Sequence, residues 1–200
     1  RSGATLPELP ALPDHVMLRW MEAWGEEMTE GARTALANPP PLDLNLRNPD
    51  ETAIWAERLE GVSLMPGHIR LSRGSAVEEL PGFEDGDWWV QDLAAQIPAR
   101  LLGPGQGRTV IDLCAAPGGK SMQLAAQGWN VISVDSSERR MKRLSENLAR
   151  TGLPARCVTA NILKWQPDEP VDAILLDAPC TATGTLRRHP DVLHRIGGRQ

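Results

Sequence analysis

The sequence predicts an α/β protein in which an open parallel sheet follows a small α+β region. From residue 109 onward, short apolar strands alternate with amphipathic helices, a pattern typical of parallel strands joined by helical crossovers. The segment 173–176 is apolar at every position, as expected of a strand covered on both faces. Residues 1–100 lack this alternation. We therefore expect a linker, an accessory region and the first part of a larger α/β domain, at residues 1–13, 14–103 and 104–200.

The accessory region is predicted to contain two helices followed by short extended pieces. Asp14 can cap a helix whose apolar residues recur at helical spacing, and Gly25 is expected to end it. Pro49 suits the start of a second helix, which we expect to end at Gly61. From 62 to 90 the signals are short, so only brief extended stretches and turns are predicted.

A third helix and a flexible joint are expected to close the accessory region. Residues 91–102 have a helical pattern, although Pro98 removes one backbone N–H and should kink or interrupt the helix. The segment 103–107 consists almost entirely of glycine and proline. We interpret it as a hinge and as the domain boundary.

The larger domain has the most regular pattern. Strands are predicted at 109–113, 131–134, 157–159 and 173–176. Helices are predicted at 120–127 and 138–150. Ser137 is a suitable N-cap for the second of these helices, and Gly152 follows its end. Because strands alternate with helices, we expect parallel pairing and a sheet covered on both faces.

Composition indicates an ordinary globular chain. Of its 200 residues, 41% are hydrophobic and 24% charged, which excludes the composition of a disordered protein. No apolar stretch is long enough to span a membrane and no signal peptide is recognisable, so we expect a soluble, cytoplasmic protein. The three cysteines are too few and too far apart for a disulfide framework or paired zinc ligands.

Charge is distributed unevenly. The first hundred residues contain 8 Lys/Arg and 17 Asp/Glu, whereas the second hundred contain 13 and 9. An anionic partner therefore suits the second half, and the run Arg187, Arg188 and His189 could contact several phosphates. A second basic cluster at 139–143 lies on a predicted helix and is expected to be a solvated face, with RNA contact as the alternative. No metal site is predicted, because the histidines lack further ligands at metal-binding spacing.

The strongest local signal lies between the first strand of the larger domain and its helix. The segment reads Asp112-Leu113-Cys114-Ala115-Ala116-Pro117-Gly118-Gly119-Lys120. It stands at the carboxyl edge of a parallel sheet, where ligands bind, and its glycines allow close approach to backbone N–H groups. It misses the triphosphate-binding loop pattern by one residue, because Cys114 stands in place of the first glycine. A tight turn without a ligand is an open alternative.

Two more strands end in acidic residues at the same predicted edge. Asp135 has the spacing of a ribose-binding carboxylate in nucleotide-binding folds, although an Asp there can equally cap a helix. In Asp177-Ala178-Pro179-Cys180, Pro179 keeps Ala178 extended, so Asp177 and Cys180 should be presented at this edge. A thiolate at Cys180 could attack an electrophilic carbon, and Asp177 could hydrogen-bond a ring amino group. Inert packing is the alternative for Cys180.

Together these segments resemble a known family. The glycine loop, the Asp177–Cys180 segment and Gly184 with Arg187-Arg188-His189-Pro190-Asp191 look like the RsmB branch of the Sun/Nop-type RNA (cytosine-5) methyltransferases. Residues 80–92 resemble the stretch that precedes the cofactor loop in those enzymes. The resemblance covers about residues 14–200. It implies a Rossmann-like S-adenosylmethionine-dependent methyltransferase fold, of which 104–200 is the N-terminal part, and ribosomal RNA as substrate.

The resemblance also implies a role for each motif residue. S-adenosylmethionine would be bound by Asp135 through its ribose and by Asn161 near its adenine, and Asp177 would lie between the cofactor and the base. Asn161 stands where the family often has an acidic residue, so it would hydrogen-bond without a charge. The loop residues implied to wrap the cofactor are Cys114, Ala115, Ala116, Pro117, Gly118, Gly119 and Lys120.

Two cysteines act on the base in this family. The cysteine of a Thr-Cys-Ser motif adds to carbon-6 of cytosine, and the Pro-Cys cysteine, here Cys180, assists product release. No Thr-Cys-Ser occurs in the 200 residues. We therefore expect this stretch to be inactive alone, and to continue for roughly 80–120 residues that add three strands to reach an ordinary sheet size.

Other functions fit part of the pattern. A DNA cytosine-5 methyltransferase would use Cys180 itself as nucleophile, but such enzymes usually carry a Phe-x-Gly-x-Gly loop. A non-catalytic RNA-binding module would keep the fold without the chemistry. A nucleotide triphosphatase is a weaker option, because only the near match of the glycine loop favours it.

Overall fold

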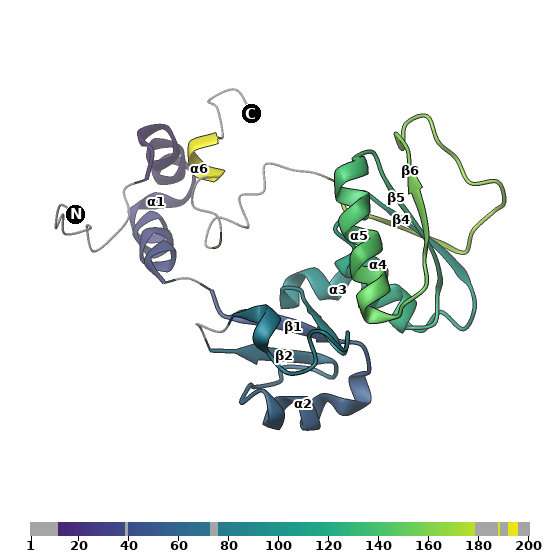
Figure 1. Cartoon of the computed structure of the whole chain (residues 1–200). Coiled ribbons are helices and arrows are strands. Elements are labelled where there is room, and N and C mark those ends of the chain that lie inside the picture. The colour runs from purple at the N-terminus through teal and green to yellow at the C-terminus, as the bar shows by residue number, and fades with distance from the viewer. Residues whose placement is uncertain (1–11, 39, 73–75, 179–187, 189–191, 196–200) are drawn as a thin grey trace, which may run out of the picture. The chain divides into compact units, whose positions relative to one another are not determined.

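The structure is a computed structural model of the chain that describes residues 12–38, 40–72, 76–178, 188 and 192–195. The described residues fall into two compact units. One unit contains those up to Pro40 together with those after Ala178, and the other is Pro41–Ala178. The predicted boundary after residue 103 lies inside the second unit, which contains both sheets (Figure 1).

The first unit contains the helices α1 (Asp14–Ala37) and α6 (Val192–Arg195). Gly25 has φ 81° and ψ 174°, so the first helical segment of α1 ends there, as predicted, and a second helical segment follows the kink. Asp14 does not cap α1, because Pro13 holds the N-cap position and no side chain bonds the cap. The buried apolar residues of this unit are Leu12, Val16, Leu36 and Leu193.

The second unit begins with a three-stranded antiparallel sheet in the order β2–β1–β3. The central strand β1 (Leu42–Leu46) pairs with β2 (His68–Leu71) on one side and β3 (Trp88–Val90) on the other. The 3-10 turn η1 (Pro49–Glu51) leads into α2 (Thr52–Arg58), which confirms the predicted second helix. The sheet and α2 share a core of Leu44, Leu46, Trp55, Ile69, Leu71 and Trp88.

Strand β1 is absent from the sequence-based prediction, although its sequence Leu-Asp-Leu-Asn-Leu has the alternation of apolar and polar residues that is typical of a strand. Asp43 and Asn45 are both buried. The Asp43 carboxylate accepts two hydrogen bonds from Arg70, at 2.7 and 2.9 Å, and one from the backbone N–H of Leu93 at 3.0 Å. A buried carboxylate is tolerated when it is paired and hydrogen-bonded in this way.

The rest of the second unit contains a four-stranded parallel sheet in the order β6–β5–β4–β7. Its strands are β4 (Thr109–Leu113), β5 (Asn130–Asp135), β6 (Arg156–Thr159) and β7 (Ala173–Leu176). Two crossover helices, α4 (Gly119–Ala126) and α5 (Glu138–Thr151), lie against the sheet (Figure 1). These six elements confirm the prediction to within one residue, and Ser137 caps α5 by accepting a bond from the backbone N–H of Arg140.

Helix α3 (Leu93–Leu101) stands in the chain between the two sheets, and the 3-10 turn η2 (Val77–Glu79) precedes β3. The predicted interruption of α3 at Pro98 is wrong, since the helix continues through it. Gln96, two residues before Pro98, and Ala99, directly after it, are completely buried. Tertiary packing therefore overrides the poor helix propensity of proline here.

The segment 103–107 is a packed loop rather than the predicted hinge. The N–H of Gly105 donates to the carbonyl of Gln127 at 2.8 Å, and the Trp129 indole N–H donates to the carbonyl of Gly103 at 2.9 Å. A Cβ on Gly105 would lie 2.4 Å from the backbone nitrogen of Trp129. Glycine is needed at position 105 because the backbone of Trp129 lies too close for a side chain, and not because the loop must be flexible.

Strand β7 forms one edge of the described sheet. Leu175 is buried, whereas Ile174 and Leu176, on the opposite face, are 59% and 58% exposed. We predicted that β7 is central in a larger sheet and that its second neighbour comes from strands outside the 200 residues; among the strands that the structure describes, its partner is β4. Because Ile174 and Leu176 are exposed, the strand also keeps one apolar face open.

Candidate functional site

The carboxyl ends of β4, β5 and β7 meet at one edge of the parallel sheet. Leu113 of β4 is in register with Val134 of β5 and with Leu176 of β7. Asp135 and Asp177 are the next residues along β5 and beyond β7. The register therefore brings the glycine loop and both predicted carboxylates to the same edge, as expected for ligand sites in open α/β sheets.

The glycine loop turns sharply from β4 into α4. Cys114 has φ 62°, and Gly118 has φ 108° in the left-handed region just before the helix begins. A Cβ on Gly118 would lie 3.0 Å from Leu144 Cγ of α5. The N–H of Ala115 donates to the carbonyl of Val134 at 3.1 Å, which fastens the loop to the neighbouring strand. Gly118 is therefore required both by its backbone angle and by the nearness of α5.

Asp135 is buried beneath the loop, with 3% of its surface exposed. Its Oδ2 accepts the N–H of Ala116 at 3.3 Å, and its Oδ1 accepts the N–H of Ser137 at 2.9 Å. The guanidinium of Arg140 lies 3.5 Å from Oδ2 and also donates to the carbonyl of Ala116. Asp135 thus organises the loop and also starts the turn into α5.

A second buried carboxylate, Asp112, lies below the loop at the end of β4. Ser121 Oγ donates to Asp112 Oδ2 at 2.6 Å, and Ser133 Oγ lies 2.8 Å from Ser121 Oγ. Burial raises the pKa of Asp112 to about 6, although the Ser121 hydrogen bond and the charge of Lys120 oppose the rise. Asp112 Oδ1 has no hydrogen-bond partner among the described residues.

The β7 side of the edge is more open. Lys120 Nζ lies 2.6 Å from Asp177 Oδ2, and 60% of the Asp177 side chain is exposed. Asn161 follows β6 at the same edge and is exposed. Its Oδ1 accepts the N–H of Leu163 at 3.0 Å, so the side chain shapes its own turn.

Three of the predicted site residues lie outside the described residues, namely Cys180, Arg187 and His189. Arg188 is described as half-buried and belongs to the other compact unit. Cys114 is half-buried in the loop, and burial raises the pKa of its thiol, which favours the unreactive protonated form.

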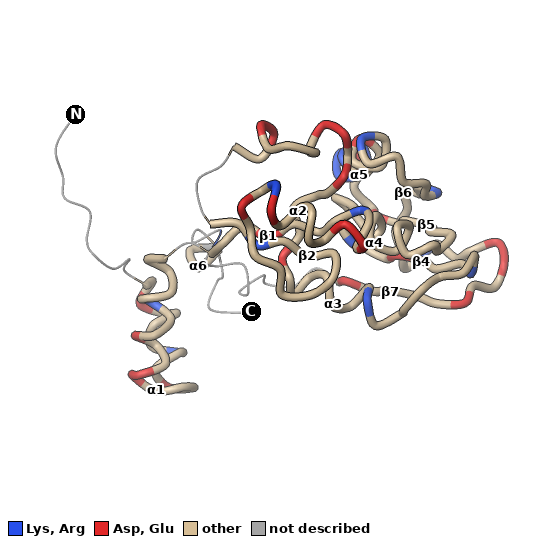
Figure 2. Tube along the Cα trace, turned by 90° about the horizontal axis from the view of Figure 1, so that it is seen from below, with Lys and Arg blue, Asp and Glu red and all other residues tan. Residues whose placement is uncertain are grey.

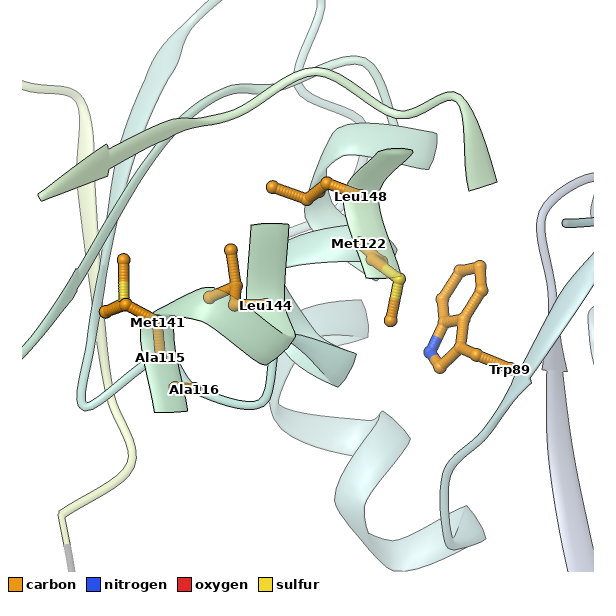
Figure 3. Packing of buried hydrophobic residues seen from close by; sticks show 7 residues of the cluster. All are labelled: Trp89, Ala115, Ala116, Met122, Met141, Leu144 and Leu148. Carbon is orange, nitrogen blue, oxygen red and sulfur yellow. The ribbon is translucent and has the colours of Figure 1, made fainter. Parts of the chain in front are cut away.

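Several residues that support the loop were missed by sequence reasoning. Trp89 of β3 packs in one cluster with Ala115 and Ala116 of the loop and with Met122 of α4 (Figure 3). Its indole N–H donates to Gln91 Oε1 at 2.8 Å. Gln91 Nε2 in turn donates to Gln123 Oε1 of α4 at 3.1 Å. Residue types alone give no signal of this support, because it joins segments that are far apart in the sequence.

Arg140 is a correction to the predicted solvated cluster at 139–143. Lys and Arg are frequent along α5 (Figure 2), and Arg139, Lys142 and Arg143 are exposed as expected. Arg140 instead directs its guanidinium to the loop and to Asp135. Its position five residues after Asp135, in the first turn of α5, is the signal that could have identified it.

A cavity of about 800 Å³ lies elsewhere, beside the beginnings of β4, β5 and β6 and residues 167–171. It has none of the predicted site residues in its lining. Because ligands of open parallel sheets bind at the opposite, carboxyl edge, we assign the candidate site to the glycine loop and not to this cavity.

Within the described ranges, no three His, Cys, Asp or Glu side chains gather in a way that could hold a metal ion. Among the described helices, none combines the length and the hydropathy that crossing a bilayer requires.

Solved structures define the class of protein. A methyltransferase homolog protein from Pyrococcus horikoshii has a TM-score of 0.66 and 25% sequence identity, covering 86% of this chain and 61% of its own. NSun6 from Pyrococcus horikoshii has a TM-score of 0.72 at 19% identity, covering 84% of this chain and 71% of its own. The fold is therefore the Rossmann-like fold of methyltransferases.

Sequence comparison narrows this class to a family. The family described as 16S rRNA methyltransferase RsmB/F matches residues 99–197. Ribosomal RNA small subunit methyltransferase B of Klebsiella pneumoniae is 37% identical over 193 residues, covering 90% of this chain and 44% of its own length. The protein of the same description from Xylella fastidiosa is 40% identical over 186 residues, covering 86% and 43%. The second half of the chain thus matches the RsmB/F family, and the chain spans less than half the length of these relatives.

Proposed function

We propose that the chain provides the cofactor-binding part of an S-adenosylmethionine-dependent RNA (cytosine-5) methyltransferase acting on small-subunit ribosomal RNA. The observation that carries the proposal is the glycine loop held by Asp135 at the carboxyl edge of the sheet. The match of residues 99–197 to the RsmB/F family supports the reaction class, and the relatives are described as ribosomal RNA small subunit methyltransferase B.

The described residues fit this cofactor. S-adenosylmethionine, when bound, supplies a methyl group attached to a positively charged sulfur. Three carboxylates, Asp112, Asp135 and Asp177, end strands at the edge, and Lys120 already pairs with Asp177. Asp112 Oδ1 is a buried acceptor without a hydrogen-bond partner among the described residues, so the site favours positive charge nearby. Asp135 would hold the ribose, and the loop from Cys114 to Lys120 would enclose the rest of the cofactor.

The roles on the base follow the family resemblance. Asp177 would lie between the cofactor and the cytosine, and Asn161 would approach the adenine. Cys180 would assist product release by helping to remove the proton from carbon-5. The cysteine that attacks carbon-6 would come from a Thr-Cys-Ser segment, which these 200 residues do not contain.

The proposed partner is ribosomal RNA. Arg187, Arg188 and His189 would contact its phosphates, so RNA affinity should fall steeply with salt concentration. A protein acting on this substrate would work in the cytoplasm. A DNA substrate is not favoured, because the relatives are described as ribosomal RNA methyltransferases.

Calorimetry with S-adenosylhomocysteine tests cofactor binding in the full-length protein. We expect binding by the unmodified protein and about 10–100-fold weaker binding by Asp135→Ala, since hydrogen bonds to a charged group contribute about 1.5–3 kcal/mol. Asp168→Ala is the control, because Asp168 is an exposed carboxylate near the opposite edge of the same sheet. Absence of binding, or equal binding by Asp135→Ala, would refute the assignment.

Covalent trapping distinguishes the RNA reaction from the DNA alternative. In the full-length protein, Cys180→Ala should accumulate a covalent RNA adduct, because the attacking cysteine remains while product release is slowed. If Cys180 were itself the nucleophile, the same variant would form no adduct with any substrate.

A further inference from the structure

Arg140 differs from the other basic residues at the start of α5. Its side chain is 43% exposed, yet its guanidinium donates to the Ala116 carbonyl and lies 3.5 Å from Asp135 Oδ2. The adjacent Arg139 is exposed, and the described part of the chain gives it no hydrogen bond or ion pair. Two neighbouring residues of the same type therefore have different surroundings.

The Asp135–Arg140 pair holds the backbone on both sides of Ala116, through the two successive peptide groups that this residue joins. Asp135 Oδ2 accepts the Ala116 N–H at 3.3 Å, while Arg140 donates to the Ala116 carbonyl. Ala116 is only 3% exposed, so water cannot easily replace either bond. A buried peptide group that loses its partner bears the cost of desolvation without compensation. The conformation of the loop centre therefore depends on both side chains.

From this arrangement we propose that Arg140 is a positioning residue of the cofactor site. It holds the Ala116 carbonyl and fixes the orientation of the Asp135 carboxylate, so that the loop and the carboxylate have their binding geometry before a nucleoside-containing ligand arrives. The inference rests on the proposed function, because Asp135 is taken there as the ribose-binding group.

The guanidinium is suited to this role in a way that lysine is not. The N–H bonds of a guanidinium lie in one rigid plane, so that a single nitrogen can direct two N–H groups at two acceptors in fixed directions. Here Arg140 Nη2 donates to the carbonyl of Ala116 and lies 3.5 Å from Asp135 Oδ2. An ammonium group carries the same charge but does not fix both acceptors with the same geometry. Lysine at this position should therefore restore part of the effect only.

The decisive experiment compares Arg140→Ala, Arg140→Lys and Arg139→Ala in the full-length protein. S-adenosylhomocysteine affinity is measured by calorimetry, and backbone protection at Ala116 by hydrogen exchange without ligand. We expect Arg140→Ala to bind about 10–100-fold more weakly and Arg140→Lys to fall between it and the unmodified protein. Arg139→Ala, which removes the same charge from the next residue, should bind within about twofold of the unmodified protein.

Hydrogen exchange separates positioning from general destabilisation. In Arg140→Ala the Ala116 amide should exchange faster while the amides of the buried strand β4 keep their protection. Equal affinity and equal Ala116 protection in Arg140→Ala and Arg139→Ala would overturn the inference. If the unmodified protein does not bind S-adenosylhomocysteine, the proposed function fails, and unchanged Ala116 protection in Arg140→Ala would then overturn the positioning role independently.

Discussion

The two halves of the carboxyl edge differ in how completely the described residues fix their polar groups. On the β4–β5 side, Asp135 is buried and shares its oxygens among two backbone N–H groups and Arg140. On the β7 side, Asp177 is mostly exposed and pairs with Lys120. Pre-organised groups lose little freedom when a ligand binds, whereas an exposed ion pair contributes little and can rearrange. The first half is therefore built to hold a fixed part of the ligand, and the second half can adapt.

The largest effect should come from Gly118→Ala on the fixed side. Its left-handed φ and the Cβ contact of 3.0 Å with Leu144 should reduce the free energy of unfolding by about 3 kcal/mol and largely abolish S-adenosylhomocysteine binding. Gly152→Ala is the matched control, because Gly152 also has a positive φ but has open space where a Cβ would lie. It should cost about 1 kcal/mol and leave binding intact. Chemical denaturation measures the free energy of unfolding, and calorimetry measures binding. Equal binding losses in Gly118→Ala and Gly152→Ala would contradict the comparison.

An intermediate effect should appear in the pH dependence of stability. The carboxyl of Asp112 has an ordinary pKa of 3.8, and burial raises its pKa in the folded protein to about 6. Between these values the folded state binds more protons than the unfolded state, so this residue stabilises the fold below pH 4 and loses that contribution as pH rises towards 6. The contribution amounts to about 2 kcal/mol between pH 4 and 6.

Denaturant unfolding at several pH values measures this contribution. Asp112→Asn should lack the decline between pH 4 and 6, whereas Asp168→Asn, at an exposed carboxylate, should keep the profile of the unmodified protein. A parallel decline in Asp112→Asn would show that the buried carboxyl does not cause it.

The smallest effect is expected on the adaptable side. Lys120→Ala and Asp177→Asn should each change the free energy of unfolding by less than about 1 kcal/mol, because the Asp177 end of the ion pair is largely solvated. Thermal unfolding monitored by calorimetry is sufficient to measure this. A loss above about 2 kcal/mol would indicate that the β7 side is as fixed as the β4–β5 side.

The elements of the parallel sheet could be predicted because each one carries its own local signal. Strand β4 is continuous and apolar before Asp112, and α5 has both a Ser cap and a glycine after its end. Strand β1 also carries a local signal, the alternation Leu-Asp-Leu-Asn-Leu, which the prediction missed; the pairing of its buried Asp43 with Arg70 from another strand has no such signal. Pro98 misled the prediction for a related reason, because the packing around α3 comes from residues distant in the sequence.

The sequence predicts which residues form the candidate site, but it does not predict the hydrogen bonds that join them. Asp135 and the glycine loop follow from spacing, whereas the bond from Arg140 to Ala116 depends on how α5 lies against the loop. The same holds for Gln91 and Gln123, whose hydrogen bond spans 32 positions of the chain. Local patterns indicate where a ligand can bind, and long-range contacts determine how firmly the site is held.

The packing of Trp89 and Gln91 against the glycine loop has a consequence for how this protein can be divided. A chain cut at residue 103 would leave Met122 without the indole that covers it and Gln123 without its buried amide partner. We therefore expect the antiparallel sheet and the glycine loop to fold together. The smallest piece that can be transplanted or studied with a native loop is Pro41–Ala178, which keeps both sheets together.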